Sequence, residues 1–166
     1  MKKFLLPVLI LLLISAVGVA FFCFRGSEEA KIRGVLQTLC RMASKSRGEN
    51  AAAAALMISR TDRIFTGEFD INVGHGLFSG KLNPTQMTSE LARYRAVFEQ
   101  VEVKAQDIEI SFHQPDQAAV VFSGTLRGTT KKGNSVSEAR DVECTLNRMP
   151  QGWMISKLII REVLER

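Results

Sequence analysis

The sequence predicts an α+β protein with an N-terminal transmembrane helix, followed by a curved antiparallel sheet packed on three helices. Three observations lead to this prediction. Residues 4–24 form an uncharged run of 21 residues, which is long enough to cross a bilayer as a helix. Apolar residues then recur at helical spacing in three segments. From residue 101 onward the apolar period changes to two, which is typical of strands.

The uncharged run at residues 4–24 is interpreted as an uncleaved signal anchor that holds the protein in a membrane. Lys2 and Lys3 precede the run, and positive charges favour the cytoplasmic side. We therefore expect a cytoplasmic N-terminus and a domain on the outer or periplasmic side. The anchor would comprise residues 1–25, and the domain would comprise residues 27–166.

Two alternatives to the anchor remain open at the level of the sequence. Gly18 and Ala20 have the small-residue spacing of a signal-peptide cleavage site. Cleavage there would give a secreted domain. A lipoprotein is less favoured, because Phe22 precedes Cys23 at the position where lipidation requires a small residue.

The net charge of +5 does not predict a nucleic-acid partner. Three of the cations flank the uncharged run, and from residue 26 onward 19 Lys/Arg residues stand against 17 Asp/Glu residues. A nucleic-acid-binding domain usually carries a strongly basic face. The small cluster of Arg41, Lys45 and Arg47 is explained by the preference of helix C-termini for cations. Contact with anionic lipid is the alternative explanation of this cluster.

The three cysteines do not predict a metal or cofactor site. Cys23, Cys40 and Cys144 form no CxxC motif and no Cys/His cluster. Cys40 and Cys144 belong to the domain, and export to an oxidising compartment would allow a disulfide between them. The sequence leaves both the bonded and the free state open.

Helical spacing predicts three helices in the first half of the domain. The first covers residues 28–46, with Ser27 as its cap, and buries one apolar face. The second covers residues 51–60 and contains an alanine run that favours helix. The third begins after Asn83, with Pro at its first position and Gln in capping-box spacing. Tyr94 belongs to its apolar face and is interpreted as a residue at the edge of the core.

Alternating apolar residues predict one short strand before the third helix and four long strands after it. Residues 69–73 form the short strand, and the glycines that follow predict a loop. The four long segments are joined by short connections, which indicates an antiparallel meander. Strands of this length twist and curl, and the helices would cover one face of the sheet. The long strands are expected at residues 101–113, 118–128, 136–148 and 153–164.

Two segments of the domain resemble a known superfamily. They are "FDINVGHGLFSGKLNPTQMTSELARY" at residues 69–94 and "GWMISKLII" at residues 152–160. Together with the order of helices and strands, they are similar to the nuclear-transport-factor-2-like superfamily of cone-shaped α+β domains. This superfamily includes ketosteroid isomerases and SnoaL-like polyketide cyclases. The resemblance implies a bent sheet whose concave face closes on the helices around a pocket.

The resemblance and the strand pattern give a short set of candidate site residues. In the isomerases, a Tyr on the first helix and an Asp on a late strand form the oxyanion hole, and an Asp near the first strand is the base. Here the first predicted helix has no Tyr, and Asp70 lies near the base position. His113 shares one side of its strand with Glu109 and Ser111, and a His/Glu pair can perform acid–base chemistry. Alternation places both Asp70 and His113 on the solvated side. Trp153 is the candidate ligand-binding residue.

The sequence-based hypothesis for function is a membrane-tethered, exported, non-catalytic domain. It would bind a partner protein, a second copy of itself or a small apolar ligand, without nucleic acid, metal or cofactor. The first alternative is a SnoaL-like or ketosteroid-isomerase-like enzyme that uses Asp70 or His113 as a general base. The second alternative is an assembly scaffold of a membrane complex, because the inner-membrane core subunit of type IV secretion systems carries a membrane-anchored version of this fold.

Overall fold

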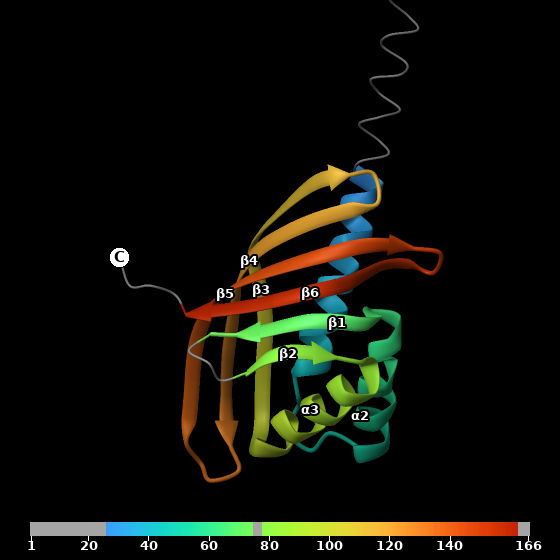
Figure 1. The fold of residues 1–166 in the computed structure, drawn as a ribbon. Helices are drawn as coiled ribbons and strands as arrows, with labels where there is room; N and C mark the ends of the chain where they lie inside the picture. The colour runs from blue at the N-terminus through green and yellow to red at the C-terminus, as the bar shows by residue number, and fades with distance from the viewer. Residues whose placement is uncertain (1–25, 75–77, 163–166) are drawn as a thin grey trace, which may run out of the picture.

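The computed structural model describes residues 26–74 and 78–162 of the 166-residue chain (Figure 1). The predicted anchor and Cys23 lie outside these residues. Within the described part of the chain, no helix is long and apolar enough to span a bilayer. The described residues form an α+β domain with three α-helices and a six-stranded sheet.

The N-terminal helix covers residues 26–43 and packs its apolar face against the sheet (Figure 1). Ile32, Leu36 and Met42 on this face are fully buried. The prediction that Ser27 caps this helix is wrong, because Ser27 is already helical. A cap residue has a non-helical backbone, and its side chain is then free to bond the first turn.

Helix α2 (Ala51–Ile58) starts at residue 51, as predicted, and Asn50 is its cap. The Asn50 side-chain oxygen accepts hydrogen bonds from two backbone N–H groups in the first turn of the helix. These N–H groups have no partner within the helix, so the cap stabilises its start. The helix continues into a short 3-10 helix, η1 (Ser59–Arg63).

Helix α3 (Pro84–Val97) starts with the predicted capping box. The Asn83 side chain accepts a hydrogen bond from the backbone of Gln86, and the Gln86 side chain accepts one from the backbone of Asn83. Met87 and Leu91 on the apolar face are buried. The capping residues therefore fix where α3 begins, and the apolar residues at helical spacing determine which face turns to the core.

The six strands have the order β2-β1-β6-β5-β4-β3. The last four strands form the predicted antiparallel meander. The prediction of a wholly antiparallel sheet is wrong, because β1 pairs in parallel with β6, for example Ile71 with Leu158. These two strands are far apart in sequence, so no hairpin sets their relative direction. The bounds are β1 Phe65–Val73, β2 Phe78–Leu82, β3 Phe98–Gln114, β4 Gln117–Thr130, β5 Ser135–Met149 and β6 Gly152–Glu162.

Strand β2 corrects the sequence-based expectation of a glycine-rich loop in this region. It pairs antiparallel with β1, and Ile71 lies opposite Gly80. The first four of its five residues are exposed, because β2 is the edge of the sheet. An exposed edge strand lacks the alternation of buried and exposed residues by which a strand is recognised in a sequence.

The long strands bend around the N-terminal helix, with α2 and α3 near one end of the sheet (Figure 1). A register shift in β3 between Gln106 and Glu109 contributes to this curvature. Asp107 within the shift has a φ of 53°, which is unusual for a non-glycine residue. A bulge of this kind bends a strand and increases its local twist.

The hydrophobic core lies between the sheet and the helices. Phe65, Leu146 and Ile155 are fully buried there, and the rings of Phe65 and Phe69 stack with their centroids 4.3 Å apart. Each fully buried aliphatic or aromatic side chain contributes about 1.5–3 kcal/mol. The core occupies the middle of the sheet and leaves an unfilled space beside it.

Candidate functional site

The unfilled space is an apolar cavity of about 590 Å³ between the sheet, the N-terminal helix and α3. All six strands contribute to its wall. Its volume falls within the range of about 300–1,000 Å³ that is usual for small-molecule pockets. The apolar side chains of the wall include Leu39, Ile71, Leu91, Phe122, Val142 and Leu158.

Tyr94 differs from the other residues of this wall because its hydroxyl group is buried without a partner. Among the side-chain nitrogen and oxygen atoms of residues 26–74 and 78–161, this is the one buried atom that makes no hydrogen bond. The Tyr94 ring contacts Phe98, with the centroids 5.2 Å apart. Burial raises the pKa of Tyr94 to about 12, so the hydroxyl keeps its donor hydrogen at neutral pH. Buried polar groups are normally hydrogen bonded, and an exception calls for an explanation.

The cavity wall also contains Glu90, Thr125 and Arg140. Glu90 is exposed on α3. Arg140 on β5 donates a hydrogen bond of 3.1 Å to Glu138 on the same strand. Burial is the largest cause of the raised pKa of Tyr94; the positive charge of Arg95 lowers this pKa, and the negative charge of Glu138 raises it. The polar part of the wall therefore combines a hydroxyl donor with an arginine whose charge is balanced by a carboxylate.

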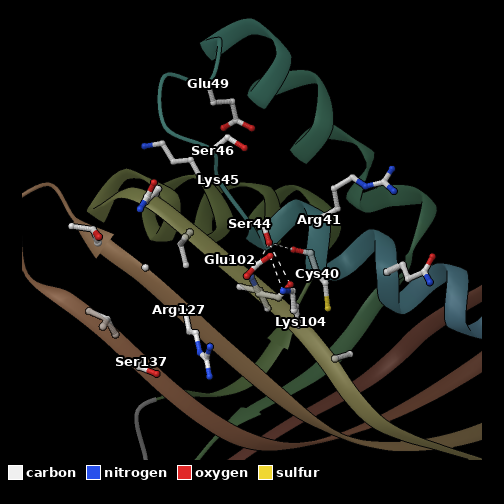
Figure 2. Close-up of a pocket in the computed structure, with 18 of the residues that line it drawn as sticks. Cys40, Arg41, Ser44, Lys45, Ser46, Glu49, Glu102, Lys104, Arg127 and Ser137 are labelled. Carbon is white, nitrogen blue, oxygen red and sulfur yellow. Dashed lines mark hydrogen bonds and ion pairs between the residues drawn. The ribbon is translucent and has the colours of Figure 1, made fainter.

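A larger and more polar groove of about 1200 Å³ lies between the end of the N-terminal helix, the segment after it and strands β3 to β5 (Figure 2). Several of its charges are already used. Lys104 pairs with Glu102 at 2.9 Å, and Lys45 donates to two backbone oxygens at the end of α3. Figure 2 shows Arg41 and Arg127 pointing away from one another. The groove therefore does not bring its positive charges to one point.

Glu49 is another charged residue of the groove, and its interaction stabilises the fold. It accepts a hydrogen bond from Arg95, which is only 4% exposed. Arg95 also donates to the backbone oxygens of Met42 and Ser44. These bonds join α3 to the end of the N-terminal helix. Of the two spaces, the apolar cavity is the better candidate for a functional site.

The two candidate bases from the sequence lie outside both spaces. Asp70 is exposed on β1, and its neighbours Phe69 and Ile71 are buried. His113 is exposed near the end of β3. Neither residue lines the cavity or the groove. Within the described residues, no cluster of His, Cys, Asp or Glu could hold a metal ion.

Trp153, the candidate ligand-binding residue, is 3% exposed. It does not line the apolar cavity but lines a separate pocket of about 560 Å³ between the N-terminal helix and the turn that joins β5 to β6. Its indole N–H donates a hydrogen bond of 2.6 Å to Glu28 on the N-terminal helix. Its ring meets Phe112 edge-on, with the centroids 6.0 Å apart. Trp153 therefore attaches the N-terminal helix to the last strand of the sheet.

Glu28 is buried, with 4% of its surface exposed. The negative charge of its carboxylate is balanced by two cationic side chains. Lys31 donates to one carboxylate oxygen at 2.7 Å, and Arg148 lies 3.6 Å from the same oxygen. The hydrogen bond from Lys31 is the main cause that lowers the pKa of Glu28 below its usual 4.5. Burial opposes this shift, and the bond from Trp153 adds to it.

Cys40 and Cys144 are both free thiols. Cys144 is buried on β5, and burial raises its pKa to about 12. Cys40 is half-buried on the N-terminal helix, where it lines both the cavity and the groove. Burial also raises the pKa of Cys40. A thiol with a raised pKa is a poor nucleophile at neutral pH.

Comparison with solved structures identifies the fold. No protein-family profile matches the chain, and no curated protein matches its sequence. A nuclear-transport-factor-2-like protein with a cystatin-like fold from Novosphingobium aromaticivorans superposes with a TM-score of 0.68 and 13% identity. The match covers 89% of this chain and 90% of that chain. The chain has the nuclear-transport-factor-2-like fold.

Two further matches show how varied the proteins with this fold are. A nuclear-transport-factor-2-like superfamily protein from Salmonella enterica has a TM-score of 0.66 at 10% identity, over 85% of this chain and 94% of that chain. A type 2 hexachlorocyclohexane dehydrochlorinase has a TM-score of 0.65 at 14% identity, over 82% of this chain and 85% of that chain. Identities this low establish the fold alone, because one fold hosts many activities.

Proposed function

We propose that this domain binds a small apolar ligand in the cavity and does not transform it. The observation that carries the proposal is the apolar cavity of about 590 Å³, with walls from all six strands and two helices. The absence of chemistry is supported by the position of Asp70 and His113, which are exposed and do not line the cavity. A ligand there would meet mainly aliphatic and aromatic side chains.

The cavity sets an expected affinity for such a ligand. A two- or three-ring molecule that buries about 250 Å² of apolar surface would gain about 6 kcal/mol from burial. Part of this gain is lost to the restriction of the ligand's motion. Dissociation constants between about 0.05 and 1 mM are therefore expected for apolar probes that match only the shape of the cavity.

We also propose that the uncharged run at residues 4–24 tethers the domain to a membrane, with the domain on the outer or periplasmic side. The run is long enough for a span, and Lys2 and Lys3 precede it, which favours a cytoplasmic N-terminus. A tether would hold the cavity close to a bilayer, in which apolar molecules concentrate. The protein should then stay with membranes after a carbonate wash, and its intact mass should include the N-terminal segment.

Binding in the cavity can be tested with N-phenyl-1-naphthylamine, a neutral apolar probe that fluoresces when it leaves water. Ala43 lines the cavity, and Ala52 is exposed on α2. Ala43→Phe places a ring in the cavity, whereas Ala52→Phe adds the same ring to the surface. We expect saturable binding to the wild type and to Ala52→Phe, and at least about ten-fold weaker binding to Ala43→Phe.

Equal binding to the wild type and to both variants would show that the probe binds elsewhere, and the proposal would fail. Thermal unfolding of each variant checks that it is folded. Thr125→Phe, which fills the cavity from β4, is a second blocking variant if Ala43→Phe does not fold.

A further inference from the structure

The buried Tyr94 hydroxyl indicates which apolar ligands the cavity would prefer. It is the one buried side-chain oxygen or nitrogen of the described residues that lacks a hydrogen-bond partner. The residue lines the cavity from α3. Leaving this group unpaired in an apolar wall carries a desolvation cost, which a ligand atom of matching chemistry would remove.

The surroundings of Tyr94 determine what that ligand atom should be. The hydroxyl is protonated at neutral pH, because burial raises the pKa of Tyr94 to about 12, so it offers a donor hydrogen. An ionised acceptor is disfavoured there. Arg140 is already hydrogen bonded to Glu138, and Glu90 of the wall is paired with Arg93 at 2.9 Å. A buried ligand carboxylate would therefore lack a cation of its own.

We propose that the cavity selects apolar molecules with one neutral hydrogen-bond acceptor, such as a ketone or ester carbonyl, and that the Tyr94 hydroxyl donates to that acceptor. This inference rests on the proposed function, because it requires that a ligand occupies the cavity. It assigns to Tyr94 the role of a specificity-determining residue. The apolar wall would supply most of the affinity, and the hydroxyl would supply the discrimination.

Three tricyclic molecules of nearly equal shape separate these contributions. Fluorene has no polar group, fluorenone has a carbonyl acceptor at the same position, and carbazole has an N–H donor there. Their dissociation constants for the full chain are measured by displacement of N-phenyl-1-naphthylamine. One neutral hydrogen bond to a buried donor should make fluorenone bind about five-fold more tightly than fluorene. A phenol hydroxyl is a weaker acceptor than donor, so carbazole should gain less over fluorene than fluorenone does.

Tyr94→Phe removes the hydroxyl and keeps the ring. In this variant fluorenone and fluorene should bind about equally well. Thr125→Val is the matched control, because it removes the other hydroxyl-bearing side chain that lines the cavity. The preference should survive in this control. Fluorene-9-carboxylate should bind more weakly than fluorenone to the wild type, since its charge would be buried without a cation.

Two results would overturn the inference and leave the proposed function intact. The first is equal binding of fluorene and fluorenone, and the second is a fluorenone preference that Tyr94→Phe does not change. Tighter binding of carbazole or of fluorene-9-carboxylate than of fluorenone would also contradict the inference. If neither the reporter nor any of the tricyclic molecules binds, both the proposed function and this inference fail.

Discussion

Glu28 on the N-terminal helix and Tyr94 on α3 both place a polar group among apolar side chains, but their hydrogen bonding differs. The Glu28 carboxylate has interactions with Trp153, Lys31 and Arg148. The Tyr94 hydroxyl has none. A buried polar group with all its bonds made within the protein holds elements together, whereas an unpaired one beside a cavity can serve a ligand. Burial alone therefore does not distinguish a structural group from a functional one.

The largest expected effect comes from Glu28→Ala. This change leaves the buried indole N–H of Trp153 without an acceptor and detaches the N-terminal helix from β6. Lys31 and Arg148 remain partly exposed, so water can solvate them. We expect a loss of about 2–3 kcal/mol in the free energy of unfolding, measured with urea. Glu29→Ala, at the half-buried neighbouring position, should cost less than about 0.5 kcal/mol. Similar losses in the two variants would mean that Glu28 does not fasten the helix.

A smaller effect follows from the charge of Glu28. Its pKa in the folded protein lies below the usual 4.5, so its ionised form stabilises the fold at every pH above that value. This contribution is lost as the pH falls through the folded pKa. At neutral pH the free energy of unfolding of the wild type should exceed that of Glu28→Gln by about 1 kcal/mol, because a charged acceptor forms a stronger hydrogen bond than a neutral one. The difference should shrink steadily below pH 4.5 in urea titrations. A difference that stays constant down to the acid transition would contradict the assignment.

The smallest expected effect on stability is that of Tyr94→Phe in the absence of ligand. The hydroxyl makes no hydrogen bond in the protein, so its removal relieves a desolvation cost. The free energy of unfolding should stay unchanged or rise by up to about 1 kcal/mol. Thermal and urea unfolding of the variant beside the wild type checks this. A loss above about 1 kcal/mol would show that the hydroxyl has a structural partner and would remove the contrast with Glu28.

The sequence predicts the architecture of the domain better than the chemistry of its cavity. The capping box at Asn83 and Gln86 and the period of two after residue 101 are local signals, and the structure confirms both elements. The parallel pairing of β1 with β6 depends on the path of the whole chain. Strand β2 could not be recognised in the sequence, because four of its five residues are exposed and it lacks the alternation of buried and exposed residues.

The roles of Glu28 and Tyr94 could not be read from the sequence for a related reason. Glu28 looks like an acidic residue in the first turn of a helix, where a carboxylate is favourable even when exposed. Its bond with Trp153 joins positions 125 residues apart. Tyr94 has the helical spacing of a core residue, and that expectation agrees with its ring packing against Phe98. Only the tertiary structure shows that its hydroxyl is buried without a partner.

An apolar ligand should lie inside the cavity, beside the unpaired Tyr94 hydroxyl. Intermolecular nuclear Overhauser effects between fluorenone and the methyl groups of the protein would locate it. Leu91, Val142 and Leu158 line the cavity, while Leu56 and Val121 are exposed elsewhere. Contacts from the fluorenone ring protons to the first three residues, and none to the other two, are the predicted result. Contacts only to Leu56 or Val121, or the same cavity contacts in a folded Ala43→Phe variant, would contradict the account.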